Sequence, residues 1–154
     1  MKKQNGFTLV ELLVVVAIIG LLSTLAVVSL NGIRERARDT KRISDIDAFQ
    51  KSMELLRTDK GAYNLCGCES TKVLSACAGK ALETYLPTLK NLNDPLWTKA
   101  CADAATCKAG TCNYTLAVTM TDSYIAYFNL EKGVANYTEG GCYKVTEKGV
   151  EKVN

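Results

Sequence analysis

The sequence predicts an α+β fold, in which a long N-terminal helix packs on a small C-terminal antiparallel sheet. Two observations predict it. Apolar residues dominate the first part of the chain and then recur every three or four positions, which is the period of a helix. Near the C-terminus, apolar and polar residues alternate, which is the period of a half-buried strand. The 154 residues suffice for one domain of ordinary size, or for a smaller one carried on a membrane segment.

The first helical segment is suited to crossing a membrane. No charged residue occurs from Leu12 to Leu30, and a helix of this length, rising about 1.5 Å per residue, spans roughly the 30 Å hydrocarbon core of a bilayer. A cleavable secretory signal is the rival interpretation, since Lys2 and Lys3 precede the run. The run is longer than the apolar part of such a signal, which has about 7–15 residues, so we expect the span to remain in the mature protein.

A single carboxylate, Glu11, lies at the start of the apolar run. At the end of an ordinary membrane helix it would lie among lipid headgroups, where a charge costs little. Its surroundings favour a more specific interpretation. A short basic leader ends in Gly6 and is followed by Phe-Thr-Leu-Val-Glu at 7–11 and an unbroken apolar helix. This combination resembles the class III signal peptide of type IV pilins and of type II secretion pseudopilins, with its prepilin-type N-terminal methylation segment.

The resemblance implies a processing site and an assembly site. Prepilin peptidase would cut between Gly6 and Phe7 and then methylate the new N-terminal amine of Phe7. Glu11 would be the carboxylate used in assembly. A carboxylate in an apolar filament core is costly unless it is paired, and the positively charged amine of Phe7 in a neighbouring subunit would supply the partner. Pairing of the two charges would set the register between subunits.

The resemblance also implies a pilin-like division of the chain. Residues 1–6 would be a cleaved leader, and residues 7–30 would form the half of the long helix that lies in the membrane and then in the filament core. Residues 31–154 would form a globular head. Within it we expect an amphipathic helix to about residue 58, cysteine-rich loops over 59–113 and a β-sheet over 114–154.

The charges that flank the span conflict with the orientation that this family would require. Two lysines precede the span and five basic residues follow it within residues 31–42, so the positive-inside rule alone would place the C-terminal part in the cytoplasm. The pilin interpretation requires the opposite, because the leader must face a peptidase on the cytoplasmic side. All cysteines lie beyond the span, where an oxidising compartment would use them. We therefore expect a single-pass precursor with its head outside the cytoplasm.

We expect the helix to run from about Phe7 to about Thr58, because no proline occurs before Pro87. Its second half carries one apolar stripe at spacings of three and four, which would pack on the sheet. The members of the stripe are Ile43, Ile46, Phe49, Met53 and Leu56.

The charge-rich stretch of residues 34–42 could bind nucleic acid or acidic lipid. Glu35 and Asp39, however, lie among its basic residues at spacings that permit pairing within the helix. The whole chain carries a net charge of only +3, far from the excess of a dedicated DNA-binding protein. We therefore predict a solvated helix face that contacts anionic headgroups before assembly. DNA uptake by related pili leaves DNA binding open as a weaker hypothesis.

Three segments near the C-terminus are predicted to form the sheet. In residues 114–120, every second side chain from Tyr114 to Met120 is apolar and faces the core, whereas the threonine and alanine residues between them face solvent. Residues 124–130 form a second strand. Residues 142–153 form a third strand and a tight turn near Lys148–Gly149, with room for a fourth strand after it.

Seven cysteines lie beyond the span, and we expect them to form disulfides that hold the loops of the head. A zinc site is not expected, because there is no histidine and no C-x-x-C pair. Three bridges would leave one thiol, and the spacing alone permits many pairings. Our preferred pairings join Cys142 to the 101–112 loop, and Cys77 to Cys66 or Cys68. The disulfide candidates are Cys66, Cys68, Cys77, Cys101, Cys107, Cys112 and Cys142.

Other chemistry is sparse in this sequence. Because there is no histidine, Ser-His-Asp and Cys-His machinery is excluded, and no carboxylate pair, phosphate loop or repeat argues for catalysis. We expect no catalytic residue, no cofactor and no metal, and the head lacks the clustered acidic residues that would predict the calcium site of some major pseudopilins. Asn113 and Asn136 each begin an N-x-T triplet typical of N-glycosylation, although such triplets also occur by chance.

Three functions stay open at this point. The leading one is a structural subunit of a type IV pilus-like surface filament, stored as a prepilin in the cytoplasmic membrane and used for adhesion, motility or DNA uptake. Its near variant is the major pseudopilin of a type II secretion system, which builds a short periplasmic filament. The third is a single-span membrane protein whose disulfide-rich head binds a ligand or exchanges thiols. For the first two, the partners would be identical or related pilin subunits, prepilin peptidase, the assembly machinery and, before assembly, membrane lipid.

Overall fold

The computed structural model describes residues 7–110 and 112–154, and these belong to two compact units. One unit ends at Glu35, and the other, Arg36–Asn154, is called the head below. A single helix, α1 (Leu9–Lys60), contributes to both units. The predicted long helix is confirmed, and its two ends lie within two residues of the predicted ones.

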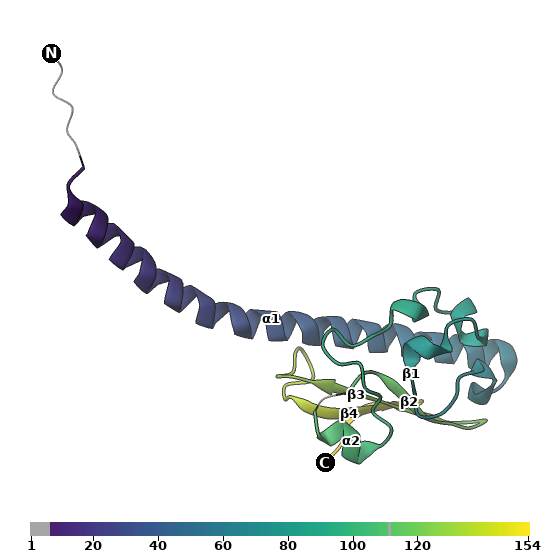
Figure 1. Cartoon of the computed structure of the whole chain (residues 1–154). Helices are drawn as coiled ribbons and strands as arrows, with labels where there is room; N and C mark the ends of the chain where they lie inside the picture. The colour runs from purple at the N-terminus through teal and green to yellow at the C-terminus, as the bar shows by residue number, and fades with distance from the viewer. Residues whose placement is uncertain (1–6, 111) are drawn as a thin grey trace. The chain divides into compact units, whose positions relative to one another are not determined.

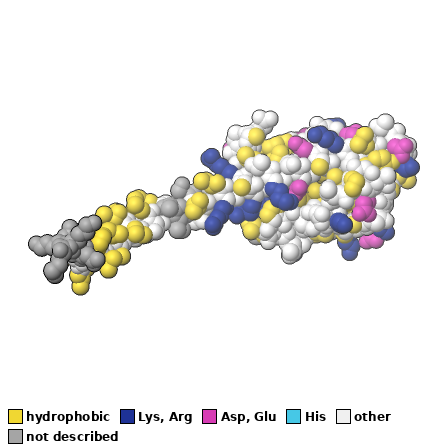
Figure 2. Space-filling view, turned by 90° about the horizontal axis from the view of Figure 1, so that it is seen from above, with side chains coloured by type: hydrophobic (Ala, Val, Ile, Leu, Met, Phe, Trp, Pro, Cys, Tyr) yellow, Lys and Arg dark blue, Asp and Glu magenta, His cyan; other side chains and the backbone are white. Residues whose placement is uncertain are grey.

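Up to Glu35, α1 presents apolar side chains on its surface. Leu21 and Leu25 are each 65 % exposed, and Figure 2 shows hydrophobic side chains over this segment. The hydroxyl groups of Ser23 and Thr24 donate to backbone carbonyls of the preceding turn, both at 2.7 Å. Such local pairing is what an apolar surrounding requires of a polar group. By length and composition, this helix can cross a membrane.

In the head, one face of α1 is buried along the predicted stripe. Phe49, Met53 and Leu56 are fully buried, and Ile46 is nearly so. Ile43 is only partly buried and packs at the margin of the same core. Full burial of a side chain of this size contributes about 1.5–3 kcal/mol to stability. The stripe therefore anchors the second half of α1 to the rest of the head.

The head contains a five-stranded antiparallel sheet in which strands that follow one another in the chain also lie side by side (Figure 1). This confirms the predicted α+β class. The short first strand lies in a segment that was predicted to be a loop. The strands are β1 (Lys72–Val73), β2 (Thr115–Thr119), β3 (Tyr124–Leu130), β4 (Gly141–Thr146) and β5 (Gly149–Lys152).

Different parts of the head cover the two faces of the sheet. On one face, Tyr124, Ala126 and Phe128 of β3 join the buried stripe of α1 in the main core. On the other face, Tyr127 packs against a second cluster of four buried cysteines. One of these cysteines belongs to the short helix α2 (Ala104–Lys108), which Figure 1 shows on the side of the sheet away from α1. Successive strand residues point to opposite faces, so β3 serves both cores.

Strand β2 departs from the half-buried pattern that was predicted for it. Thr115 and Ala117 are buried, although both were expected to face solvent, whereas Met120 is 59 % exposed. The prediction is wrong for two reasons. A register shift between Leu116 and Val118 interrupts the alternation of the strand at Ala117, and the cysteine-rich loop covers Thr115. The backbone N–H of Cys101, for example, donates to the Thr115 hydroxyl at 2.7 Å.

The connection between α1 and β2 is built mainly from short turns, apart from β1 and α2. Leu74, Leu82 and Leu89 from three of these turns are fully buried in the main core. This irregular part of the chain is therefore packed as firmly as the helix and the sheet. The turns are 3₁₀ helices, namely η1 (Tyr63–Cys66), η2 (Leu74–Cys77), η3 (Ala81–Thr84) and η4 (Leu89–Asn91).

Candidate assembly site

The start of α1 is closed by reciprocal hydrogen bonds between Thr8 and Glu11. The backbone N–H and the hydroxyl of Thr8 donate to Oε2 of Glu11 at 2.9 and 2.8 Å. In return, the backbone N–H of Glu11 donates to Oγ1 of Thr8 at 3.3 Å. This capping box satisfies donors that the first turn of a helix otherwise leaves unpaired. It was not predicted from the sequence, although Thr-x-x-Glu before an apolar run is its signal.

Three residues were predicted to direct processing and assembly, and the structure describes two of them. Gly6 lies outside the described residues. Phe7 precedes the helix and is 81 % exposed, and Glu11 lies in the first turn of α1. The carboxylate of Glu11 is thus held at the N-terminal end of a helix, where the helix dipole favours a negative charge. Its partner within the chain is Thr8.

The charged stretch over residues 34–42 contains a buried ionic centre, which corrects the predicted solvated face. Asp39 and Arg42 are both fully buried, and they pair within the helix at 2.8 Å, as their spacing permits. The Arg42 guanidinium also donates to Asp94, at 2.7 Å from Nε, and to Glu131. The prediction is wrong for Asp39 and Arg42 because Asp94 and Glu131 lie 52 and 89 residues from Arg42 in the sequence. The pattern of α1 alone does not indicate them. Arg36 and Lys41, in contrast, are exposed as predicted.

The ionic centre is electrostatically matched despite its burial. Burial on its own would lower the pKa of Arg42, but hydrogen bonds to Asp94, Glu131 and Asp39 raise this pKa above its ordinary value. The hydrogen bond from Arg38 lowers the pKa of Glu131, against the opposing effect of burial. Both shifts favour the charged forms of Arg42 and Glu131, and buried charges are tolerated only when they are paired.

Asp39 and Arg42 fasten two distant loops to α1. The Asp39 carboxylate accepts the backbone N–H groups of residues 131, 132 and 133, each at 2.9 Å. The Arg42 guanidinium lies 4.5 Å from the ring centre of Trp97, a cation–π distance, in the loop that also contains Asp94. The hydrogen-bonding groups of this centre are used inside the head, so its role is to position loops.

The cysteines form three disulfides and leave one thiol. The bridge to Cys142 ties β4 to α2, within the 101–112 loop. Of the two candidates for Cys77, the structure pairs Cys68 and leaves Cys66 as a buried thiol. The bridges are Cys68–Cys77, Cys101–Cys112 and Cys107–Cys142.

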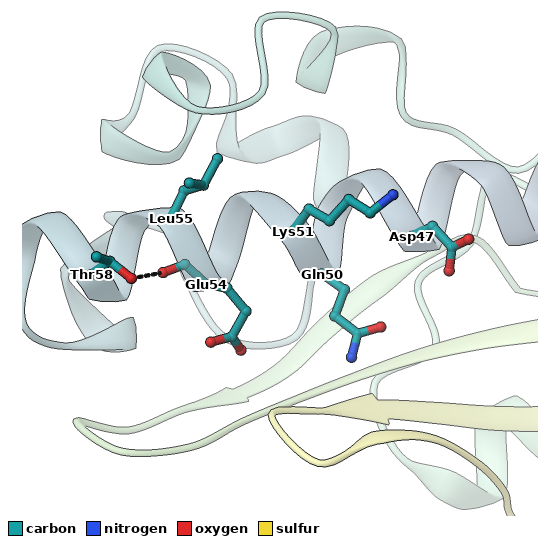
Figure 3. Close-up of a pocket in the computed structure, with 6 residues that line it drawn as sticks. All are labelled: Asp47, Gln50, Lys51, Glu54, Leu55 and Thr58. Atoms are coloured by element: carbon teal, nitrogen blue, oxygen red, sulfur yellow. Dashed lines mark hydrogen bonds between the residues drawn. The ribbon is translucent and has the colours of Figure 1, made fainter.

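Side chains of α1 outside the buried stripe line a shallow groove of 590 Å³ (Figure 3). Gln50 and Glu54 point to the side on which the sheet lies, and Lys51 and Leu55 point to the opposite side. Leu55, at 56 % exposure, is the one large apolar side chain of the lining. The groove thus offers a mixed contact surface without a catalytic arrangement. Its lining consists of Asp47, Gln50, Lys51, Glu54, Leu55 and Thr58.

Two other predicted features can be placed in the head. Among the described residues, the one group of potential metal ligands is formed by Cys101, Cys107 and Cys112, and all three belong to disulfides. Asn113 is buried, and its side-chain oxygen accepts the backbone N–H of Asp94 at 2.7 Å, so a glycan has no access to it in the folded head. Asn136, in contrast, is exposed.

Similarity to known proteins concentrates in the N-terminal part of the chain. Residues 1–27 match the family model described as the prokaryotic N-terminal methylation motif. The chain is 39 % identical over 62 residues to the type II secretion system core protein G of Aeromonas hydrophila, covering 40 % of this chain and 43 % of that protein. The protein of the same name from Escherichia coli K12 is 43 % identical over 61 residues, or 40 % of this chain and 42 % of that one. A fimbrial protein of Pseudomonas aeruginosa is 41 % identical over 54 residues, which is 35 % of each chain.

These similarities cover only part of each protein. The chain spans about two fifths of the length of the core proteins G that it matches. No solved structure matches it. The methylation motif, the apolar helix and the capped Glu11 nevertheless coincide in one segment. The N-terminal segment of this chain is therefore similar to those of type II secretion system core proteins G and of a fimbrial protein.

Proposed function

We propose that this chain is a pseudopilin, a structural subunit that assembles with related subunits into a filament of a type II secretion system. The observation that carries the proposal is the similarity to proteins named type II secretion system core protein G, at 39 % and 43 % identity. The sequence alone favoured a surface pilus, and the relatives favour its alternative. In this role the protein is not an enzyme and needs no cofactor.

A surface-pilus subunit is the second candidate. It is supported by the similarity to a fimbrial protein of Pseudomonas aeruginosa, at 41 % identity over 54 residues. Such a filament would serve adhesion, motility or DNA uptake. Both candidates use the same N-terminal segment, so the subunit is processed in the same way in both. They differ in whether the filament stays in the periplasm or extends from the cell surface.

The precursor is held in the cytoplasmic membrane by the apolar part of α1, with its head outside the cytoplasm, where disulfides can form. Prepilin peptidase removes residues 1–6 by cutting between Gly6 and Phe7. Methylation of the new terminus leaves a positively charged amine on Phe7. Assembly machinery in the membrane then transfers the subunit from lipid to the filament.

The capping box provides Glu11 with a partner while the subunit is alone. In lipid, an unpaired carboxylate is costly, and Thr8 supplies two donors from the same chain. In the filament, the Phe7 amine of a neighbouring subunit is the stronger partner, because a bond between two charged groups is stronger than one to a hydroxyl. Replacement of Thr8 by the Phe7 amine as the partner of Glu11 therefore favours the filament over the free subunit. It also sets the register between neighbouring subunits.

The decisive experiment is the intact mass and the N-terminal sequence of the protein in two fractions of its native cells, sheared surface filaments and washed envelope. A methylated Phe7 terminus confined to the envelope supports the pseudopilin. The same terminus enriched in the sheared fraction supports the surface pilus instead. An intact Met1, or cleavage elsewhere, in both fractions would overturn both proposals.

A further inference from the structure

Three of the seven cysteines lie together in and beside the main core. Cys66 is the last residue of η1, Cys77 is the last residue of η2, and Cys68 follows Cys66 after a single glycine. Cys68 and Cys77 are bonded, with Cα atoms 5.0 Å apart, and Cys66 is a thiol. This group holds three sulfurs and one disulfide, so one sulfur is always left over.

The backbone holds the Cys66 thiol next to the disulfide. Its Sγ accepts the backbone N–H of Cys68 at 3.2 Å. Gly67, between the two cysteines, has a left-handed φ of 73°, and a Cβ at this position would lie 3.2 Å from Cβ of Lys80. The backbone N–H of Lys80 in turn donates to the carbonyl of Cys77 at 3.1 Å. The segment with Cys66 and Cys68 is therefore packed against the turn that carries Cys77.

This disulfide is more accessible than the other two. A groove of 210 Å³ opens beside it, with Cys77 in its lining, and Cys68 is partly exposed. The four cysteines of the other two bridges are at most 3 % exposed. The lining carries positive charge on Lys72 and Lys80 and negative charge on Glu69. The groove is lined by Gly67, Glu69, Lys72, Ala76, Cys77 and Lys80.

We propose that Cys66, Cys68 and Cys77 form a thiol–disulfide exchange site. The thiolate of Cys66 attacks Sγ of Cys77, so that a Cys66–Cys77 bond forms and the Cys68–Cys77 bond breaks. The electron pair of the broken bond leaves on Sγ of Cys68, which takes up the proton that Cys66 lost. No net oxidation occurs, because one disulfide and one thiol are present before and after the step.

The exchange moves the thiol from a buried to a partly exposed position. Burial raises the pKa of the Cys66 thiol, although the N–H of Cys68 opposes this effect, so Cys66 by itself is a poor nucleophile toward reagents in solution. The Cys68 thiol produced by the exchange adjoins the groove. There its thiolate can attack a low-molecular-weight disulfide, which forms a mixed disulfide on Cys68 and releases one molecule of the small thiol. The site is thus a modification site of the head.

The test uses the full chain in detergent micelles and oxidised glutathione as the probe. After incubation, the sample is quenched with acid, the remaining thiols are blocked, and tandem mass spectrometry of non-reduced peptides locates each bond. We expect glutathione on Cys68 together with a Cys66–Cys77 bridge. A sample unfolded in denaturant, in which Cys66 is accessible, is the positive control. An adduct on Cys66 or Cys77 of the folded protein, or no adduct at all, would overturn the proposal.

Two serine variants test the roles of the individual cysteines. Cys66→Ser removes the attacking thiol and is expected to abolish the adduct while the Cys68–Cys77 bridge stays intact. Cys68→Ser is expected to form a Cys66–Cys77 bridge during oxidation and to show no thiol. The circular dichroism of both variants reports whether the head is folded. A folded Cys68→Ser head with thiols at both Cys66 and Cys77 would contradict the proposal, and if this variant does not fold, the location of the adduct in the unmodified sequence decides.

Discussion

The part of α1 before Glu35 and the head satisfy their polar groups in opposite ways. In the first region, polar side chains such as Thr8, Glu11 and Ser23 find their partners within one helical turn. In the head, the partners of Arg42 include residues 52 and 89 positions away. A helix suited to lipid has to pair its polar groups locally, because the bilayer offers no other partner. A packed head brings distant partners together, so we expect polar substitutions to affect assembly in the first region and stability in the second.

The largest effect is expected from Glu11→Ala. Removal of one member of a buried ion pair costs about 3–5 kcal/mol, which at a subunit contact corresponds to a loss of assembly of more than about a hundredfold. The yield of filaments from cells that express the variant measures this loss. The melting temperature of the head should not change, because Glu11 lies in the other unit. Glu69→Ala, at an exposed position of the head, is the matched control. Normal filaments with Glu11→Ala would contradict the assigned role.

The second effect concerns the ionic centre of the head. Arg42→Met leaves the buried Asp39 and Asp94 without their cation, and such a loss costs about 3–5 kcal/mol of unfolding free energy. Urea unfolding of the full chain in detergent, followed by circular dichroism, measures it. Arg36→Met, on an exposed position of the same helix, should change stability by no more than about 0.5 kcal/mol. Equal small effects of the two variants would show that the centre does not anchor the loops.

The third effect compares two disulfides of the cysteine cluster. The double variant Cys107→Ser/Cys142→Ser opens a bridge between residues 35 apart, and Cys101→Ser/Cys112→Ser opens one between residues 11 apart. Each loss is expected to cost about 2–4 kcal/mol, and the longer loop should cost about 1 kcal/mol more, because closing it removes more entropy from the unfolded chain. Urea unfolding of both variants measures the difference. A larger loss for the shorter loop would mean that contacts, and not chain entropy, dominate.

The smallest effect is a pH dependence of the head that passes through Glu131. The hydrogen bond from Arg38 lowers the pKa of Glu131 in the folded state. The contribution of ionised Glu131 to the unfolding free energy is therefore complete above the pKa of an unfolded glutamate, about 4.3. It is lost as the pH falls through the lower pKa of the folded state. Glu131→Gln removes this acid-dependent part, which we expect to be within about 1 kcal/mol for a partly exposed pair. Thermal melts of both proteins between neutral and acidic pH measure it. If the melting temperature of the variant falls as steeply at acidic pH as that of the original protein, other carboxylates are responsible for the loss of stability.

Much of the fold and of the assembly site could be predicted from local sequence patterns. Apolar residues at spacings of three and four predict α1 and its buried stripe, and the alternation of side chains predicts strand β3. Both patterns are contained in consecutive residues. The importance of Glu11 followed from its place in an apolar run and from the resemblance to a family. The capping box with Thr8 could also have been predicted from the sequence, because its signal is contained in four consecutive residues.

Only the tertiary structure decided which distant residues meet. The seven cysteines permit many pairings, and the choice of Cys68 over Cys66 for Cys77 depends on how two turns pack. Asp39 and Arg42 look like members of a solvated face until Asp94 and Glu131 are brought to them. Thr115 is buried beneath a separate loop, whose Cys101 N–H donates to its hydroxyl. The spacing of apolar residues predicts the secondary structure of a segment. Burial and side-chain pairing in the head depend on contacts between segments that are distant in the sequence.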